Sequence, residues 1–235
     1  VMAVSVNASR LFVGGRFNQF CSNRFNGLAV YNGSVWEPLG LGVGGGSVMA
    51  MAVLGKMLYV GGDFSSAGGK PLDRVAAWNV ETSSWYYVGT VDGNVHALLA
   101  WDGHLLAGGS FSTANDRLAV GVARYTPAAA SNAEMQGGTN AATDDGWGDA
   151  QLGVWHPVGR GIEGRVNQLA AARGCLYAAG DLSSVSDHGG VRPAPPRKVS
   201  CRSRTYVTAG QREARWRRPD TLSMTRPTSR VPGAG

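Results

Sequence analysis

The residues best suited to catalysis or metal binding in this chain are its histidines and cysteines. The four histidines are His96, His104, His156 and His188, and the three cysteines are Cys21, Cys175 and Cys201. They form no His-x-His, His-Glu-x-x-His or Cys-x-x-Cys pair that could hold a metal. Cys175 begins an apolar stretch, which favours a core position over a nucleophile. The sequence therefore predicts no catalytic residue, no metal site and no cofactor.

Composition narrows the class of protein further. Of the 235 residues, 35 are glycine, 43% are hydrophobic and 16% are charged. The chain is too apolar to be wholly disordered, and its glycines lack the every-third spacing of collagen. No apolar run approaches the roughly 20 residues of a membrane span. We therefore expect a glycine-rich all-β protein without a membrane span.

A motif that recurs along the chain identifies an internal repeat. It reads LFVGGRF from Leu11, LYVGGDF from Leu58, LLAGGSF from Leu105 and LYAAGDL from Leu176. The first two intervals are 47 residues and the third is 71. A valine lies ten residues before each leucine, at Val1, Val48, Val95 and Val166. Fixed offsets of this kind indicate a repeat architecture.

Aromatic residues extend each of the first three units. Twenty residues after the leucine come Tyr31, Trp78 and Tyr125, and a W-x-x-[L/V]-G string then begins at Trp36, Trp85 and Trp155. Short apolar runs separated by Gly, Asn and Asp predict four strands per unit. The pairs Asn32-Gly33 and Asp102-Gly103 suit type I′ hairpins, because each residue tolerates a positive φ.

Four strands in about 47 residues is the period of a β-propeller blade, whose two faces can be covered only by neighbouring blades. We expect about three and a half four-stranded blades, with units near 1–47, 48–94 and 95–165 and an incomplete unit at 166–190. The glycine pairs leave room for a large side chain, and the tryptophans are the expected occupants. The pairs are Gly14-Gly15, Gly61-Gly62 and Gly108-Gly109.

Two segments fall outside the repeat. Residues 126–151 form an insertion rich in Ala, Asn, Asp, Gly and Thr, which predicts a flexible surface loop. Its acidic residues Asp144, Asp145 and Asp149 lack the spacing of a calcium loop. From 191 onward no landmark recurs, and the aromatic expected after Leu176 would fall on Pro196.

Charge separates this last segment from the rest. Residues 1–190 carry 11 basic and 14 acidic residues, a net charge of −3, whereas residues 191–235 carry 11 basic and 2 acidic residues, a net of +9. We expect 191–235 to be a disordered Arg/Pro-rich tail. A shifted reading frame or retained intron would give the same abrupt change, and a basic binding tail is the third interpretation. Because the basic charge is confined to the tail, nucleic-acid binding by the repeats is not expected.

These repeats resemble the kelch-type propeller repeat of the galactose oxidase central domain. The spacing from Trp78 to Trp85 matches that pattern, although the spacing from Tyr31 to Trp36 is two residues shorter. The fuller unit, with its LYVGG-x-F, A-x-W-N and W-x-x-VG strings, is more similar to large extracellular propeller proteins such as the fungal bud-site cortical-marker family. The resemblance covers about 1–190. It implies a propeller with a non-catalytic role at the cell surface or outside the cell.

Other polar residues of the repeat give weaker signals. Asp63 and Asp181 follow the glycine or alanine-glycine pair, but Arg16 and Ser110 take the same place, which argues against a repeated metal ligand. Glycosylation sequons begin at Asn7 and Asn32 and agree with an extracellular protein.

Together these observations predict a non-catalytic binding module that contacts protein or glycan through loops on the propeller faces. The alternative is a secreted propeller enzyme, an oxidase or a carbohydrate-active protein, whose catalytic blades lie outside this chain. About three and a half blades cannot close the usual ring of four to eight, so self-association of an open arc is also expected.

Overall fold

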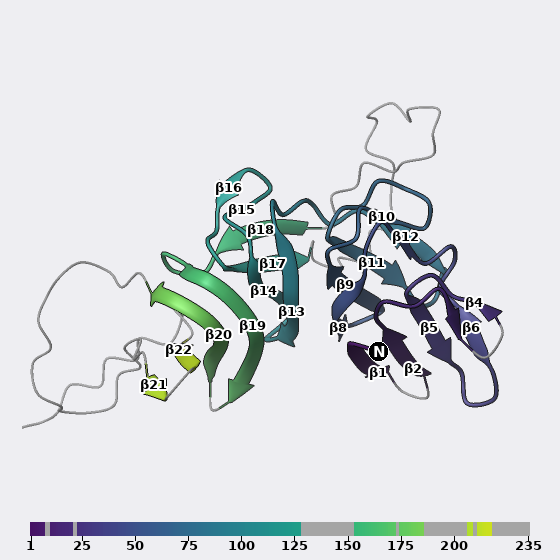
Figure 1. Cartoon of the computed structure of the whole chain (residues 1–235), viewed down its shortest axis with the longest axis horizontal. Coiled ribbons are helices and arrows are strands. Elements are labelled where there is room, and N and C mark those ends of the chain that lie inside the picture. Colours follow the sequence, from purple (N-terminus) through teal and green to yellow (C-terminus); the bar gives the residue numbers. More distant parts are fainter. Residues whose placement is uncertain are drawn as a thin grey trace, which may run out of the picture.

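The computed structural model describes residues 1–7, 10–20, 23–127, 153–172, 174–185, 206–208 and 211–217. Within these ranges the regular structure is entirely β-strand, arranged as four antiparallel four-stranded sheets and three two-stranded ribbons. Figure 1 shows the four sheets following one another across the molecule, from the purple first sheet to the green fourth. Each sheet corresponds to one repeat unit, and we refer to it as a blade.

The first three blades have their strands in chain order. The first contains β1 (Ala3–Asn7), β2 (Arg10–Gly14), β5 (Leu28–Tyr31) and β6 (Trp36–Pro38). The second contains β8 (Val48–Leu54), β9 (Met57–Gly62), β11 (Val75–Asn79) and β12 (Ser84–Tyr86). The third contains β13 (Asn94–Trp101), β14 (His104–Ser110), β17 (Val122–Pro127) and β18 (Gly153–Pro157). Residues 126 and 127 of the predicted insertion belong to β17, and its residues 128–151 lie outside the described ranges.

Short ribbons occupy the loops at one end of the blades. They pair β3 (Gln19–Phe20) with β4 (Asn23–Arg24), β7 (Val43–Gly44) with β10 (Ser66–Ala67), and β15 (Thr113–Ala114) with β16 (Arg117–Leu118). The second ribbon joins the loop that enters the second blade to a loop within that blade. The incoming strand β8 is therefore fixed to the blade it begins.

The fourth blade is completed by residues from the predicted tail. Its first two strands are β19 (Ile162–Ala172) and β20 (Cys175–Val185), and β22 (Gln211–Arg217) and β21 (Tyr206–Thr208) follow in space. The sequence predicts a disordered tail here, whereas 206–208 and 211–217 pair as strands; the rest of 191–235 lies outside the described residues. The free edge of β20 explains the difference, because its unpaired backbone groups are a template for another strand.

The register of β22 restores a repeat landmark. Trp216 stands opposite Leu176. In the first three blades the corresponding position, opposite the motif leucine, holds Tyr31, Trp78 and Tyr125. The fourth aromatic, which the sequence places at Pro196, is therefore found at 216 in register, after a longer connection.

The two predicted hairpin turns have different outcomes. Asp102 and Gly103 have φ values of 55° and 74° and connect the paired residues Trp101 and His104, so this type I′ turn is confirmed. The Asn32-Gly33 prediction was wrong, because only Gly33 takes a positive φ and four residues separate the paired strands. The Asn32 side chain instead accepts hydrogen bonds from the amides of Ser34 and Val35.

The first glycine of each pair receives a side chain from the next blade. A Cβ atom added to Gly61 would lie 2.6 Å from Cγ1 of Val95, which is closer than real contacts allow. The same approach, at 2.5 and 2.7 Å, joins Gly14 to Val48 and Gly108 to Val166. The expectation that tryptophans fill this space was therefore wrong. The compact valine fits because both backbones lie close to the inner edge of the blades.

The second glycine of each pair serves its own blade. A Cβ at Gly62 would run into the carbonyl oxygen of Ser47, and one at Gly109 into that of Asn94. At Gly15 the added atom would lie 3.0 Å from the backbone of Val1. Glycine at this position thus allows the first strand of each blade to start directly beside the end of the second.

The tryptophans join neighbouring blades further from the inner edge. The Trp85 indole donates a hydrogen bond of 3.3 Å to the Leu39 carbonyl of the first blade. Likewise Trp155, which is buried, donates one of 2.5 Å to the Val88 carbonyl of the second. Both acceptors precede the glycine that ends a W-x-x-[L/V]-G string. Trp85 also packs edge-on against Trp78, with ring centroids 5.2 Å apart.

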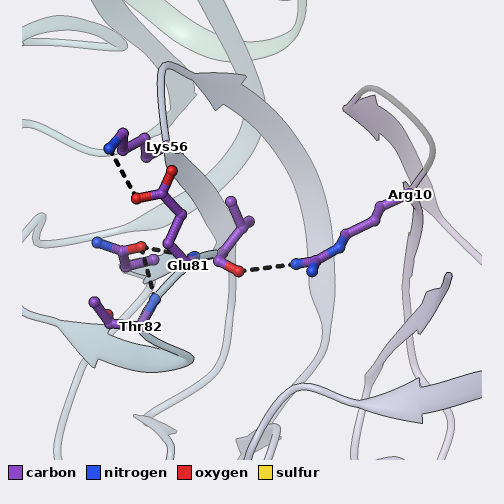
Figure 2. A network of polar contacts seen from close by, with 6 residues as sticks. Arg10, Lys56, Glu81 and Thr82 are labelled. Carbon is purple, nitrogen blue, oxygen red and sulfur yellow. Dashed lines mark hydrogen bonds and ion pairs between the residues drawn. The ribbon is translucent and has the colours of Figure 1, made fainter.

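A polar contact also joins the first and second blades, at the end of the blades away from the two-stranded ribbons (Figure 2). Arg10 donates a hydrogen bond of 2.8 Å to the Val80 carbonyl, across the two blades. The neighbouring Lys56–Glu81 ion pair, at 2.8 Å, lies within the second blade and is exposed on both sides. Exposed pairs of this kind contribute at most about 1 kcal/mol, so the apolar and glycine contacts carry most of the junction.

Buried side chains gather between blades. One cluster joins the first and second blades around Leu28, Leu58 and Trp78, and another joins the second and third around Tyr59, Tyr125 and Trp155. A smaller cluster joins the third and fourth around Val166. Each blade is therefore stabilised chiefly by its neighbours, as in other repeat proteins.

The glycine junction predicts strong coupling between two residues. Replacing Gly61 by Ala should lower the free energy of unfolding by about 1–3 kcal/mol, because the new methyl group overlaps Val95. In a Val95→Ala background the same replacement should cost much less. Urea unfolding of the four chains of this cycle measures the coupling. Equal costs in both backgrounds would contradict the junction.

The strands from the tail give a second prediction. Deleting residues 191–235 should speed hydrogen exchange at the β20 amides by about tenfold or more, because the β22 partner strand is lost. A matched deletion of 218–235 leaves both strands in place and should have no such effect. If the two deletions exchange alike, β22 does not form part of the blade.

Candidate functional site

The first strands of all four blades border one open hollow. β1, β8, β13 and β19 stand side by side at the inner edge of the arc, and the hollow between them measures about 620 Å³. The side chains that reach it come from every blade, with a contribution from Tyr177 on β20. We call this region the axial hollow. It is the place where the described residues bring side chains from four repeats together.

A repeated backbone irregularity aims side chains into the axial hollow. The pairing register shifts by one residue after Val48, Val95 and Val166, which leaves Met49, His96 and Asn167 as bulged residues. All three line the hollow, together with Met2, which has the same place in the first unit. Bulges commonly redirect a side chain at a functional site. We call these four residues the axial ring.

The axial ring varies in chemistry while its surroundings do not. The preceding residue is valine in every unit. In the second, third and fourth blades this valine packs on the first glycine of the previous blade. The ring residue itself is methionine twice, histidine once and asparagine once. Thioether, imidazole and amide groups together offer adaptable apolar contact and directional hydrogen bonds. That mixture suits binding of a partly apolar ligand.

His96 is the polar centre of the ring. Its Nε2 lies 3.0 Å from the Ser110 hydroxyl on the adjacent strand. Burial, and then the nearby positive charge of Arg165, lower the pKa of His96 below its ordinary value of 6.5, with Asp63 opposing them. The neutral imidazole is therefore favoured at neutral pH, with one nitrogen able to donate a hydrogen bond and the other to accept one.

The residues that follow the glycine pairs are not among those that line the axial hollow. Asp63 accepts hydrogen bonds from the amide and hydroxyl of Ser47, at 2.6 and 2.8 Å. Burial alone would raise the pKa of Asp63, but these bonds and the charge of Arg16 lower it. In the fourth blade Asp181 instead pairs with Arg165. Asp63 thus holds the residue before β8, and Asp181 holds a residue of β19, so both have structural contacts within their own blade.

Leucine and methionine form the apolar wall of the hollow. Met51, Leu98 and Leu169 line it, and each also lies near the glycine of the preceding blade. These residues are held in place because they belong to the blade junctions. The residues of the wall therefore pack between blades as well as lining the hollow.

The other residues considered from the sequence lie elsewhere. Cys175 is fully buried, in agreement with the expected core position. His104 and His156 are on the third blade, away from the axial hollow. Burial, followed by the charges of Arg124 and Arg117, lowers the pKa of His156. Outside the described residues lie His188, Cys21, Cys201 and the acidic residues of the insertion, Asp144, Asp145 and Asp149.

The sequons have separate outcomes. Asn32 is exposed in the loop between β5 and β6, and its amide donates a hydrogen bond of 2.6 Å to Glu37. Asn7 ends β1, and its side chain lies outside the described residues.

Sequence reasoning found the valines but missed the axial ring beside them. The available signal was the residue that follows each valine. Its position in the repeat is fixed, but the amino acid there changes from Met to His to Asn. The bulge that turns this residue toward the axis follows from strand pairing across the glycine pair. It leaves no separate mark in the sequence.

Comparison with known families supports the fold. Residues 35–144 match the family model described as the Rax2 C-terminal beta propeller domain. The chain is a partial β-propeller. No curated protein was found to be significantly similar to it. The matched range runs from the end of the first blade through the second and into the insertion of the third.

The described residues lack two further features. They contain no helix with the length and apolar character needed to cross a membrane. In the same part of the chain, no group of three or more His, Cys, Asp or Glu side chains is placed to hold a metal ion.

The environment of His96 makes a prediction about pH. Its pKa should lie below 6.5 in the folded chain, and Arg165→Gln should raise it by removing a nearby positive charge. Because the unfolded chain binds this proton more readily, His96 should destabilise the fold as the pH falls below 6.5. NMR titration of the histidine ring signals measures both values.

His156 provides the internal control for this titration. Its pKa is lowered by burial and by other charges, and Arg165 is not among them, so Arg165→Gln should leave it unchanged. A His96 midpoint at or above 6.5 in the unmodified chain would contradict the described environment.

Proposed function

We propose that this β-propeller is a non-catalytic binding module that contacts a protein or glycan through the axial ring and the loops around it. The observation that carries the proposal is the repeated bulge, which presents Met49, His96 and Asn167 in one hollow. The invariant features of the repeat are used for packing between blades. The variable ring residues make no such junction, so their variety is available for recognition.

Hydrogen bonds hold two loops of the third blade together. Asp92 accepts hydrogen bonds from the Ser112 and Thr113 amides, at 2.7 and 2.8 Å. Asn115 accepts one of 2.8 Å from the Thr90 amide. These contacts connect the loop entering the third blade to a loop within it. A ligand bound here would meet a preorganised surface, which reduces the entropic cost of binding.

We further propose that the module acts at the cell surface or outside the cell. The support is the resemblance to large extracellular propeller proteins, with which the match to the Rax2 C-terminal beta propeller domain agrees. An exposed sequon at Asn32 is compatible with this location. The kelch and galactose oxidase subtype remains a sequence-based prediction.

A binding experiment tests the proposed site. The full chain is applied to a glycan array and to a phage-displayed peptide library, and retained ligands are measured again with a Met49→Ala, His96→Ala, Asn167→Ala variant. We expect their affinity to fall at least about tenfold, which corresponds to the loss of one or two good contacts. Thermal unfolding of the variant confirms that it is folded.

The opposite end of the blades offers a matched control. A Lys56→Ala, Glu81→Ala, Thr82→Ala variant removes the same number of side chains from the surface drawn in Figure 2. Its affinity for the retained ligands should be unchanged. Ligands that respond to the control variant and not to the axial-ring variant would place binding elsewhere.

A further inference from the structure

A row of basic side chains lies on one face of the third blade. Arg124 on β17 is directly opposite His156 on β18, and on its other side it is opposite Leu106 on β14. Residues directly opposite one another in a sheet share a face, as do residues two apart along a strand, so His104 belongs to the same face. All three basic side chains are half-buried. We call His104, Arg124 and His156 the basic row.

The packing of the repeat does not require an arginine at the centre of this row. The residue in the place of Arg124 is Val30 in the first blade and Ala77 in the second, as the strand registers show. Both of these side chains are buried among apolar residues. A small apolar side chain therefore satisfies the packing at this position, and the charge of Arg124 is left for another role.

Within the described residues the basic row has no counter-charge. The ion pairs in this part of the chain join Lys56, Arg74 and Arg165 to carboxylates, and none includes a member of the row. Neither Nε of Arg124 nor Nδ1 of His104, both buried atoms, has a hydrogen-bond partner among the described residues. A half-buried positive charge without a partner destabilises a fold. An anion bound beside it would offset that destabilisation.

The positive charge extends beyond the row and has an apolar neighbour. Arg117 is exposed on β16, a ribbon strand that lies against β18. Burial lowers the pKa of His156, and the charges of Arg124, Arg117 and His104 lower it further. Val154, two residues before His156 on the same face, is 43% exposed. The surface can therefore contact more than one negative charge and an aliphatic group together.

This combination favours a peptide over a sulfated glycan. A peptide can present carboxylates and aliphatic side chains at neighbouring positions, whereas a sulfated glycan has anionic groups without aliphatic side chains. The planar guanidinium of arginine also matches the two oxygens of a carboxylate.

We propose that the basic row binds an acidic segment of a protein partner. Arg124 pairs with one carboxylate of that segment, the two histidines hydrogen-bond to neighbouring acidic groups, and Val154 contacts an aliphatic side chain. This surface is separate from the axial hollow, because none of these residues lines it. The proposal therefore does not rest on recognition by the axial ring.

Fluorescence anisotropy tests this site with a labelled hexapeptide in which Glu and Val alternate. The full chain should bind this probe, and Arg124→Ala should weaken binding at least about tenfold through the loss of charge-assisted hydrogen bonds. The variant should fold normally, because alanine already occupies the same place in the second blade as Ala77. The matched control, Arg24→Ala, removes an exposed arginine on β4 and should leave the affinity unchanged.

NMR titration of the histidine rings locates the bound probe. The peptide should raise the pKa of His156, because a carboxylate beside it opposes the positive charges that lower this pKa. The pKa of His96, which lies in the axial hollow, should not change.

Weaker binding by Arg124→Ala alone, with a response at His156, supports the proposal. It is overturned if the unmodified chain does not bind the peptide, if both arginine variants weaken binding equally, or if a sulfated oligosaccharide binds more tightly than the peptide. A response at His96 in place of His156 would put the peptide in the axial hollow and would also overturn it. The axial-ring variant should bind the peptide as the unmodified chain does, so this test and that of the axial ring can fail independently.

Discussion

The fold depends on a close contact between the glycine of one blade and the valine of the next. Because Gly14, Gly61 and Gly108 lack a Cβ, Val48, Val95 and Val166 can lie directly on the backbone of the preceding blade. This contact brings the first strands together at the inner edge and lets the tryptophans reach carbonyl groups further out. No blade covers its own faces, so stability and shape both arise at the junctions.

The same contact explains how a fold made of repeated packing residues can present a variable site. Fixing the valine on the glycine is accompanied by a bulge at the next residue, and the bulge turns that side chain toward the axis. Met49, His96 and Asn167 are therefore positioned by residues that do not vary, while their own types are free to differ. The valine that packs on the neighbouring blade and the residue that lines the axial hollow are thus adjacent along the strand.

Much of this architecture could be predicted from the sequence because its landmarks recur at fixed separations along the chain. The offsets between Val48, Leu58 and Trp78 reveal four strands and their order. The occupant of the glycine space could not be predicted, since contact between blades is not local in sequence. The pairing of β22 with β20 was missed for the same reason: its aromatic, Trp216, is displaced by a long connection, and only the register reveals its place.

The most direct test of this account is native-state hydrogen exchange compared across the four inner strands of the unmodified chain. If the junctions supply the stability, β8 and β13, which have a blade on each side, should exchange far more slowly than β1, which has one. Protection of β1 equal to that of β8 would contradict the account, because stability would then arise within blades and not between them.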